Sequence, residues 1–449
     1  MDPAVTAGAR PVRIVILGGG FAGIATAARL ERILRPGEAE TALVSRENYS
    51  LFTPMVPEVS SGGLAARHVV TPIRAQLRRT QFYLAEVKHV DLGAQSVTIE
   101  HALLGTTSRL PYDHLVFALG SVSSTFGLPG VADHSLPLKT LEDADRLRNH
   151  VIAMLEIADV TTDPQARARL LTFVFVGGGF TGVEAAGEMV DFFASIGRFY
   201  RGFAIGDIRI VLIEGGARLL PELVSGMGEY SARELQRRGI DVVLGDLVAG
   251  ADDDCLQLRS GRRIETATVV WSAGVRPSPR VQALGLAIGR GGAIVTTADM
   301  AVPGQTNLWA IGDCAAIPDP TGKPYPPTAQ HAIREGPVLA ENIARRLRGQ
   351  PTRPFRYASL GMMASLGARS GVAGLSNGLI LSGFPAFFLW RMYYLARLPG
   401  LDRRFRVAFD WLLNLIFPRD IAELRIYAQR ARAEVQANPA NVAPAKPSA

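Results

Sequence analysis

The chain has 449 residues, too many for one small hydrophobic core, so we expect two or three domains. Apolar residues make up 48% and charged residues 20% of the chain, a composition that excludes a disordered protein. The two cysteines, Cys255 and Cys314, lie far apart and exclude a disulfide framework and a Cys-x-x-Cys redox or metal centre. The net charge of +7 comes from residues 351–432, which carry twelve arginines against four acidic residues. Such a segment favours contact with nucleic acid or with an anionic membrane surface.

The first predicted element is a buried strand over residues 12–17, which runs through a glycine turn into an alanine-rich helix. Gly18, Gly20 and Gly23 have the G-x-G-x-x-G spacing in the strand–turn–helix context that this motif requires. The first glycine permits the tight turn, the second lets a pyrophosphate approach the backbone, and the third lets helix and strand pack closely. The free N–H groups of the helix then face the phosphates. The pattern predicts a dinucleotide site.

The next predicted strand ends at Ser45, where an acidic residue is expected to bind the ribose hydroxyls of a dinucleotide. Two interpretations remain open. Either Glu47 takes the acidic role two residues later, or Ser45 makes one weaker hydrogen bond.

Two further hydrophobic strands end in turns of small residues, at Gly120 and at Gly274. Chain crossings between two nucleotide-binding domains have this form, so we expect the chain to pass between domains at these two positions.

A second glycine turn, with Gly177, Gly179 and Gly182, repeats the first one. The strand after it ends at Glu214, whose carboxylate can accept from both ribose hydroxyls and repels a 2′-phosphate, which favours NADH over NADPH. From the third glycine to this strand end there are 32 residues, against 22 in the first copy. The surplus predicts a helix lengthened through residues 191–203.

A last strand ends at Gly312 and Asp313. An aspartate in this place can accept from the ribityl chain of a flavin while the start of a following helix faces its phosphates. The alternative to all these sites is a doubly wound sheet whose glycines only permit tight turns and bind no nucleotide.

Together these stretches resemble the flavoproteins with two dinucleotide-binding domains, and among them the type II NADH dehydrogenases, the non-proton-pumping NADH:quinone oxidoreductases. The more specific motifs are "NYSLFTPMVPEVSSG", "GGGFTGVEAAGE" and "PPTAQHAIREG". The resemblance implies an α/β fold of two Rossmann-like domains, the NAD domain inserted in the FAD domain, and a C-terminal amphipathic helical region for membrane attachment. The implied bounds are 11–124 and 292–350 for FAD, 125–291 for NAD, 351–432 for the membrane segment and 433–449 for a disordered tail.

The resemblance also implies the roles of single residues. Glu184 and Gln330 are the expected catalytic residues, with Glu184 near the nicotinamide; the alternative for Glu184 is a capping carboxylate in the first turn of a helix. No metal is expected. The positions implied for non-covalent FAD and for NADH are Gly18, Gly20, Phe21, Ala22, Gly23, Arg46, Gly120, Gly177, Gly179, Thr181, Gly182, Glu214, Gly274, Gly312, Asp313, Ala329 and Gln330.

The stretch "PPTAQHAIREG" begins, by resemblance, a helix beneath the isoalloxazine ring that contributes to the quinone pocket. Gln330 matches the first glutamine of the family, whereas Arg334 replaces the second. Arginine always carries charge and cannot accept a hydrogen bond. It either supports an anionic reduced flavin or a quinol oxygen, or it points into solvent. We expect the quinone at Gln330 and Arg334.

Residues 379–417 interleave aromatic side chains with five arginines. Their longest uncharged stretch, residues 379–390, is shorter than the ~20 residues that span a bilayer. The pattern predicts interfacial helices on an anionic membrane surface and disfavours nucleic acid. A homodimer interface would use the same aromatics, and the two are compatible. Residues 1–12 lack the apolar core of a signal peptide, so we expect a peripheral protein on the cytoplasmic face of the cell membrane.

The predicted function is hydride transfer from NADH to FAD, followed by transfer of two electrons to a membrane quinone. One alternative is a related flavoprotein reductase with another acceptor. A sulfide:quinone oxidoreductase depends on a pair of cysteines near the flavin. That class is disfavoured because the only two cysteines, Cys255 and Cys314, lie in unrelated parts of the sequence. A second alternative is a non-catalytic, NADH-sensing flavoprotein.

Overall fold

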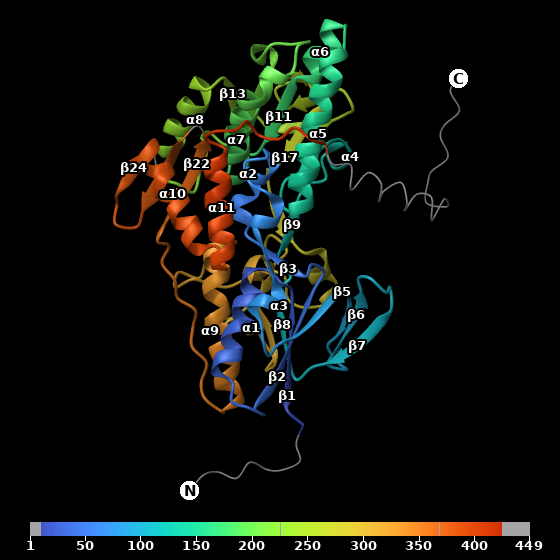
Figure 1. Ribbon diagram of the computed structural model, residues 1–449. Coiled ribbons are helices and arrows are strands. Elements are labelled where there is room, and N and C mark those ends of the chain that lie inside the picture. The colour runs from blue at the N-terminus through green and yellow to red at the C-terminus, as the bar shows by residue number, and fades with distance from the viewer. Residues whose placement is uncertain (1–9, 225, 368, 424–449) are drawn as a thin grey trace, which may run out of the picture.

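The computed structural model describes residues 10–224, 226–367 and 369–423 and has two open sheets in an elongated molecule (Figure 1). The first sheet is parallel from β20 to β5 and continues through antiparallel β6 and β7. Its strands, in spatial order, are β20 (Leu308–Ala310), β8 (His114–Phe117), β1 (Val12–Leu17), β2 (Ala39–Ser45), β5 (Gln81–Asp91), β6 (Ser96–His101) and β7 (Thr107–Pro111).

Two helices lie side by side on this sheet, α1 (Phe21–Ile33) and α9 (Ala329–Leu347). They approach closely because Gly336 has no side chain: a Cβ atom there would lie 2.7 Å from the Cβ of Ala25 and 2.8 Å from the carbonyl oxygen of Ala22. The central strands are continuous apolar runs because both faces of the parallel part are covered.

The second sheet is wholly parallel. Its strands are β10 (Leu136–Pro137), β17 (Thr268–Trp271), β11 (Thr172–Val176), β12 (Arg209–Glu214) and β13 (Ile240–Leu244). The long helices around it are α5 (Leu141–Val160), α7 (Phe180–Ile196) and α8 (Met227–Arg237). Thr140 and Asp143 form a capping box that starts α5. An antiparallel meander is added by β14 (Val248–Ala251), β15 (Cys255–Leu258) and β16 (Arg263–Glu265).

The chain passes between the two sheets along a two-stranded ribbon. β9 (Ser121–Ser123) follows Gly120, β18 (Val275–Pro277) follows Gly274, and the two strands pair antiparallel. The predictions of two Rossmann-like sheets and of crossings at these glycines are confirmed. The domain bounds given above stay a prediction. The smaller elements are β3 (Tyr49–Leu51), α2 (Val56–Ser60), β4 (Val70–Pro72), α3 (Ile73–Gln76), α4 (Val131–His134), α6 (Pro164–Leu170), β19 (Ile294–Val295) and β21 (Ala315–Ala316).

The prediction of a helix through residues 191–203 is wrong beyond Ile196, where α7 ends. A single 3₁₀ turn (Gly197–Phe199) follows, and the chain then folds back. Gly197 permits this return, since a Cβ atom there would lie 2.2 Å from the Ile205 side chain.

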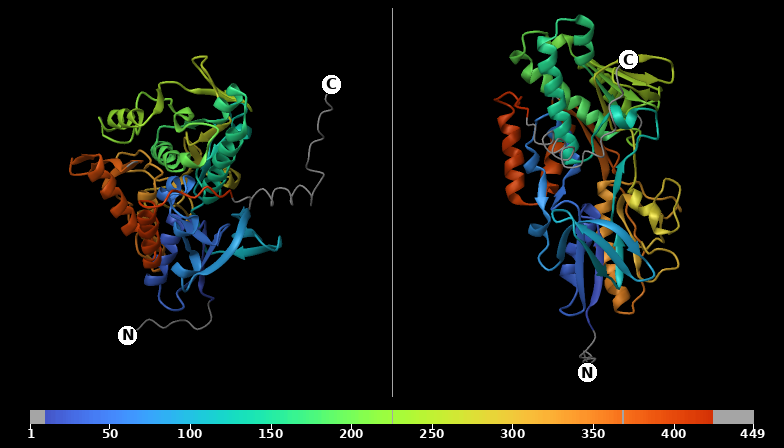
Figure 2. Two further views of the ribbon diagram at one scale, coloured as in Figure 1. Left: turned by 45° about the horizontal axis from the view of Figure 1, so that its top comes forward. Right: turned by 90° about the vertical axis from the view of Figure 1, so that its right-hand side faces the viewer.

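The C-terminal segment contains helices, as expected: α10 (Phe384–Arg397) and α11 (Leu401–Leu413) lie along one flank of the molecule (Figure 2). A three-stranded antiparallel sheet precedes them and was not expected: β22 (Gly361–Gly367), β23 (Ser370–Leu375) and β24 (Ile380–Ser382). β22 packs on α7 at Gly187, where a Cβ atom would lie 2.5 Å from the carbonyl oxygen of Leu366. Of the helices in the described ranges, none has the length and apolar content needed to cross a bilayer. The predicted tail, 433–449, lies outside the described residues.

Candidate functional site: two glycine turns and an aromatic cavity

The first glycine turn joins β1 to α1 and leaves a space above the helix. Gly18 has φ +121°, and a Cβ atom on it would lie 2.0 Å from the carbonyl oxygen of Ala118. A Cβ atom on Gly23 would lie 2.0 Å from the carbonyl oxygen of Gly18. Gly20 differs, because no atom lies within 4 Å of its Cβ position and no side chain caps the helix there. Free helical N–H groups facing open space fit a pyrophosphate.

The second turn, between β11 and α7, has the same geometry. Gly177 has φ +112°, and a Cβ atom on it would lie 2.7 Å from the Cα of Ala273. A Cβ atom on Gly182 would lie 1.9 Å from the carbonyl oxygen of Gly177. Gly179 has an open Cβ position at the uncapped start of α7, and Thr181 lies in its first turn. The chain therefore has two cradles of one design.

The strand beside each cradle ends differently. Glu214, at the end of β12, accepts from the backbone N–H groups of Gly178 and Gly216, each at 2.6 Å. These two bonds hold its carboxylate at the rim of the second cradle. Ser45 ends β2 at the corresponding place, and Arg46 after it is exposed.

The turn at Gly312 and Asp313 connects the two halves of the molecule. Asp313 accepts from the Ser121 hydroxyl at 2.5 Å, and the Lys139 ammonium donates to the same hydroxyl at 2.8 Å. The Gly312 N–H donates to Glu335 on α9 at 2.7 Å, and burial raises the pKa of Glu335 to about 7. Burial also lowers the pKa of Lys139, against the attraction of Asp313. Sequence patterns gave no sign of Lys139, which merely precedes the N-cap of α5.

The helix expected to follow this turn does not begin directly after it. Only a 3₁₀ turn, Gly312–Cys314, follows, because the chain extends at once into β21, which pairs with β19. The next helix is α9, which begins at Ala329 with the Thr328 hydroxyl as its N-cap.

A cavity lies where the starts of α1 and α9 meet β22 and α10. It encloses about 820 Å³ of empty space, its open mouth included, and its wall is mainly apolar and aromatic. The lining residues are Phe21, Phe52, Pro54, Phe180, Thr328, Ala329, Gln330, His331, Ile333, Arg334, Ser359, Met362, Met363, Tyr393, Tyr394 and Arg397. The structure thus brings Phe21, Ala329, Gln330 and Arg334 together at one cavity. Of the other predicted positions, Gly312 and Asp313 form a turn of their own, Glu184 is buried on α7, and the rest lie along the two cradles and the crossings.

Gln330 and Arg334 occupy neighbouring turns at the start of α9. The Gln330 amide donates to the carbonyl oxygen of Gly361 at 2.9 Å and accepts from the Tyr357 hydroxyl at 2.9 Å. Arg334 donates to the Gln330 carbonyl oxygen at 2.8 Å, and its guanidinium lies 4.3 Å from the centre of the Tyr357 ring. Arg334 is therefore held in the cavity wall, which contradicts the alternative that it points away into solvent.

Glu184 is buried on α7 and binds the C-terminal segment. It accepts from the Ser365 N–H at 3.0 Å and from the Trp390 indole N–H at 2.9 Å. Burial raises its pKa to about 8, so the carboxyl group is mainly protonated at neutral pH. The capping alternative is wrong, because α7 begins at Phe180 and Glu184 lies beyond its first turn.

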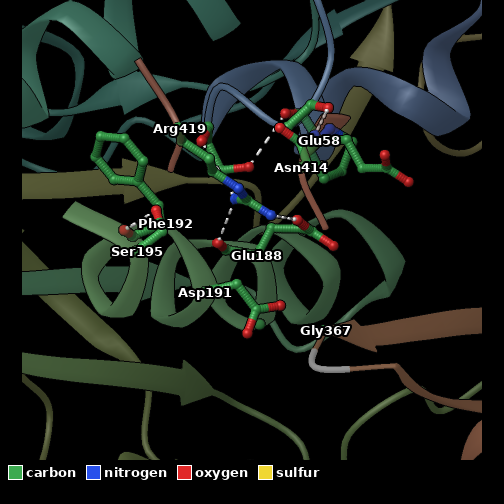
Figure 3. A network of polar contacts seen from close by, with 12 residues as sticks. Glu58, Glu188, Asp191, Phe192, Ser195, Gly367, Asn414 and Arg419 are labelled. Atoms are coloured by element: carbon green, nitrogen blue, oxygen red, sulfur yellow. Dashed lines mark hydrogen bonds and ion pairs between the residues drawn. The ribbon is translucent and has the colours of Figure 1, made fainter. Parts of the chain in front are cut away.

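Two more buried carboxylates, Glu58 on α2 and Glu188 on α7, hold the end of the C-terminal segment (Figure 3). The Trp411 indole donates to Glu58 at 2.6 Å, and the Arg419 guanidinium pairs with Glu188 at 2.8 Å. Arg419 also donates to the carbonyl oxygen of Ser61 at 3.2 Å. Burial raises the pKa of Glu58 to about 7. Sequence reasoning missed this network, because its partners lie more than 200 residues apart.

The two cysteines do not form a pair at these sites. Cys255 lies in the antiparallel meander and Cys314 next to Asp313, and both are buried free thiols. In the part of the chain that the structure describes, no three His, Cys, Asp or Glu side chains are grouped to hold a metal ion.

Two protein-family models match this chain. The family model of the pyridine nucleotide-disulphide oxidoreductases matches residues 12–336. The family model of the NDH2 C-terminal domain matches residues 360–420. The type II NADH:quinone oxidoreductase Ndh of Mycobacterium tuberculosis is 32% identical over 439 residues, which cover 94% of this chain and 92% of that protein. The chain belongs to the type II NADH:quinone oxidoreductase family.

Two other proteins are similar to this chain. A probable NADH dehydrogenase of Dictyostelium discoideum is 31% identical over 419 residues and covers 91% of both chains. The structure of NDH2 from Plasmodium falciparum in complex with NADH superposes with a TM-score of 0.85 at 20% identity. It covers 92% of this chain and 100% of that chain, and at this identity the likeness concerns the fold.

Proposed function

We propose that this type II enzyme transfers hydride from NADH to a non-covalently bound FAD and passes two electrons to a quinone, without pumping protons. The flavin, when bound, supplies the chemistry, since it exchanges hydride with NADH and electrons with the quinone. The chain supplies binding, orientation and electrostatics. The observation that carries this proposal is the pair of matching cradles, each open at its second glycine.

The residues of the two cradles have separate roles in this proposal. The first turn holds the FAD pyrophosphate, and Asp313, fixed by Ser121, accepts from the ribityl chain. The second turn holds the NADH pyrophosphate, and Glu214 accepts from the adenosine ribose. Its carboxylate repels a 2′-phosphate, which favours NADH. Glu184 lies on the helix that starts at this second turn, and we place it on the nicotinamide side.

The acceptor site of the proposal is the aromatic cavity. Gln330 and Arg334 are the polar residues that we assign to the quinone, and the apolar wall keeps water from the reacting ring. Burial raises the pKa of Glu184 to about 8, and its carboxyl group accepts from the indole of Trp390 on α10, near this wall.

A pair of glycine variants tests the assignment of the cradles. Gly20 and Gly179 have φ −81° and −75°, which any residue can adopt, so the Cβ atom of a valine at either place would lie in open space. Gly20→Val should yield protein without FAD. Gly179→Val should keep stoichiometric FAD, measured by absorbance, but lose rapid bleaching by NADH. If both variants bind both nucleotides normally, the assignment is wrong.

Anaerobic stopped-flow mixing tests the reaction. NADH should bleach the flavin rapidly, and a short-chain ubiquinone added in a second mix should restore its absorbance. Rapid bleaching with slow recovery from every acceptor would instead favour the NADH-sensing alternative.

We also propose that the C-terminal helices bind a membrane surface peripherally. Large apolar side chains on and after α10 and α11 are exposed, while the arginines between them suit anionic headgroups. The most exposed of them are Phe384, Phe388, Leu401, Phe405, Phe409, Leu412, Leu415, Ile416 and Phe417. Replacing Phe405 and Phe409 by serine should reduce sedimentation with anionic vesicles while flavin reduction by NADH stays rapid.

The same apolar surface can pair two copies of the chain. Sedimentation velocity of the wild type and the double serine variant tests this homodimer, since loss of vesicle binding with an unchanged oligomer would separate the two surfaces. The prediction of the cytoplasmic face is tested by adding NADH to inverted and right-side-out membrane vesicles, of which only inverted vesicles should oxidise it.

A further inference from the structure

The cavity proposed for the acceptor has an unbalanced charge. Arg334 and Arg397 contribute two guanidinium groups to its wall, whereas no acidic side chain is among its described lining residues. Its one histidine, His331, adds no opposing charge, and both burial and the Arg334 charge lower its pKa. The structure pairs neither arginine with a carboxylate in the described ranges; each lies over a tyrosine ring instead, Arg334 over Tyr357 and Arg397 over Tyr393.

The hydrogen bonds of the wall decide which group can bind a ligand oxygen. Both ends of the Gln330 amide are used, by Gly361 and by Tyr357, so this side chain must break a bond before it contacts a ligand. Arg334 has five N–H donors and uses one for the Gln330 carbonyl oxygen. Arg334 is thus the half-buried cation of the wall that keeps donors for an occupant.

The remaining walls select the shape of that occupant. Phe52 lies edge-on to Phe21 and to Tyr394, with ring centres 6.1 and 5.9 Å apart. Aromatic walls of this kind bind flat rings. A flat ring with a negative oxygen would satisfy both the walls and the unpaired guanidinium, because a charge-assisted hydrogen bond is roughly twice as strong as a neutral one.

We propose that this cavity selects aromatic acceptors that carry an ionised ring oxygen, of the acidic 2-hydroxyquinone class, and that Arg334 is the residue that selects them. The inference rests on the proposed function, because it assumes that the cavity is the acceptor site. Glutamine, the residue of the family pattern at this place, can donate a hydrogen bond but brings no charge.

Equilibrium dialysis against the purified full-length holoenzyme tests the selection without turnover. The two probes are 2-hydroxy-1,4-naphthoquinone, which is an anion at neutral pH, and neutral 1,4-naphthoquinone of nearly the same shape. The variants are Arg334→Gln, Arg334→Lys and the control Arg356→Gln, which removes the same charge from an exposed residue outside the cavity wall.

The wild type should bind the anion more tightly than the neutral quinone. Arg334→Gln should weaken binding of the anion by about tenfold or more and change binding of the neutral quinone less than about twofold. Arg334→Lys should keep part of the preference, and Arg356→Gln should keep all of it. Equal binding of both probes by the wild type, or the same losses in Arg356→Gln as in Arg334→Gln, would overturn the inference.

Reoxidation of the NADH-reduced flavin by the two quinones tests this inference separately from the proposed function. If the neutral quinone reoxidises the NADH-reduced protein but the anion has no advantage in binding, the selection is wrong and the proposed function stands. If the anion binds through Arg334 but no quinone of either kind restores the flavin absorbance, the proposed function fails and the anion site stands.

Discussion

At the scale of single residues, Glu214 shows how a side chain can have a structural and a binding role at once. Its carboxylate fixes the turns at Gly178 and Gly216, and in our proposal the same group accepts from the ribose of NADH. Glu214→Ala should therefore raise the KM for NADH by about tenfold or more, with little change in kcat, because the ribose lies far from the reacting carbon. Steady-state kinetics with NADH and NADPH measure this.

The control for that prediction is Glu222→Ala, which removes an exposed carboxylate on the loop that follows. An unchanged KM in Glu214→Ala, or an equal rise in both variants, would contradict the assignment of Glu214. The variant should also discriminate less against NADPH, because the negative charge that repels the 2′-phosphate is gone.

Glu184 gives a prediction about pH. Its folded-state pKa, about 8, lies above the ordinary value of 4.5, so the folded protein binds its proton more tightly than the unfolded chain. The contribution of this bound proton to the free energy of unfolding is fully present below pH 4.5 and is lost as the pH rises through 8. Glu184→Gln keeps an acceptor for Ser365 and Trp390 without this ionisation. Its melting temperature should rise relative to that of the wild type between pH 6 and 9, as thermal unfolding at several pH values will measure.

A constant difference in melting temperature over that range would mean that Glu184 does not titrate there. Burial also raises the pKa values of Glu335 and Glu58, so the parent protein will show all three titrations. The comparison of wild type with Glu184→Gln isolates one of them.

The glycines could be predicted at the residue scale because each has a physical role that only glycine fills. Gly18 and Gly177 have positive φ, and Gly23 and Gly182 leave room for a backbone oxygen. No local pattern marks residues such as Lys139 or Glu58. Lys139 owes its environment to Asp313 and Glu58 owes its environment to Trp411, and both partners are distant in sequence.

At the scale of elements, α7 is the helix whose buried acids bind the C-terminal segment. Arg419 and Glu188 form an ion pair whose side chains are only 11% and 4% exposed. Arg419→Ala leaves a buried carboxylate unpaired, so it should lower the free energy of unfolding by about 3–5 kcal/mol. Urea denaturation of the holoenzyme measures the loss.

An exposed ion pair supplies the contrast. Arg10 and Asp113 are 64% and 31% exposed, and Arg10→Ala should cost no more than about 1 kcal/mol. Equal costs at the two places would mean that the Arg419 contact is not buried in solution.

The sheet of the C-terminal segment could not be read from its sequence. Nearly all of β22 and β23 is buried, so their residues show no alternation of apolar and polar side chains, and many are glycine, alanine or serine. The helices that follow were predictable, because aromatic and arginine residues recur along them. Their exposed apolar faces agree with that pattern.

At the scale of the whole molecule, the two Rossmann-like sheets meet along the β9–β18 ribbon and the C-terminal segment covers one flank of both (Figure 2). The fold class followed from the doubled strand–turn–helix pattern, because two glycine turns of the same type require two sheets that end in them. The relation of the C-terminal segment to α2 and α7 did not follow, since it depends on contacts between distant parts of the chain.

Truncation should show how far the C-terminal segment belongs to the core. A chain ending at residue 378 loses Trp390 and Trp411, which leaves Glu184 and Glu58 buried without these donors. We expect a lower melting temperature and loss of FAD on purification, whereas Phe405→Ser, an exposed change, should retain both properties. A truncated chain as stable as the wild type would contradict this view.

The carboxylates of α2 and α7 also bear on how such proteins can be recombined. A chimaera that takes residues 360–423 from a relative loses Trp390, Trp411 and Arg419 of this chain, while their partners Glu184, Glu58 and Glu188 stay in place. We therefore expect such a chimaera to fold stably only if the parts of α2 and α7 that carry these acids are taken from the same relative. The C-terminal segment and the surfaces of α2 and α7 that it contacts therefore form one structural unit.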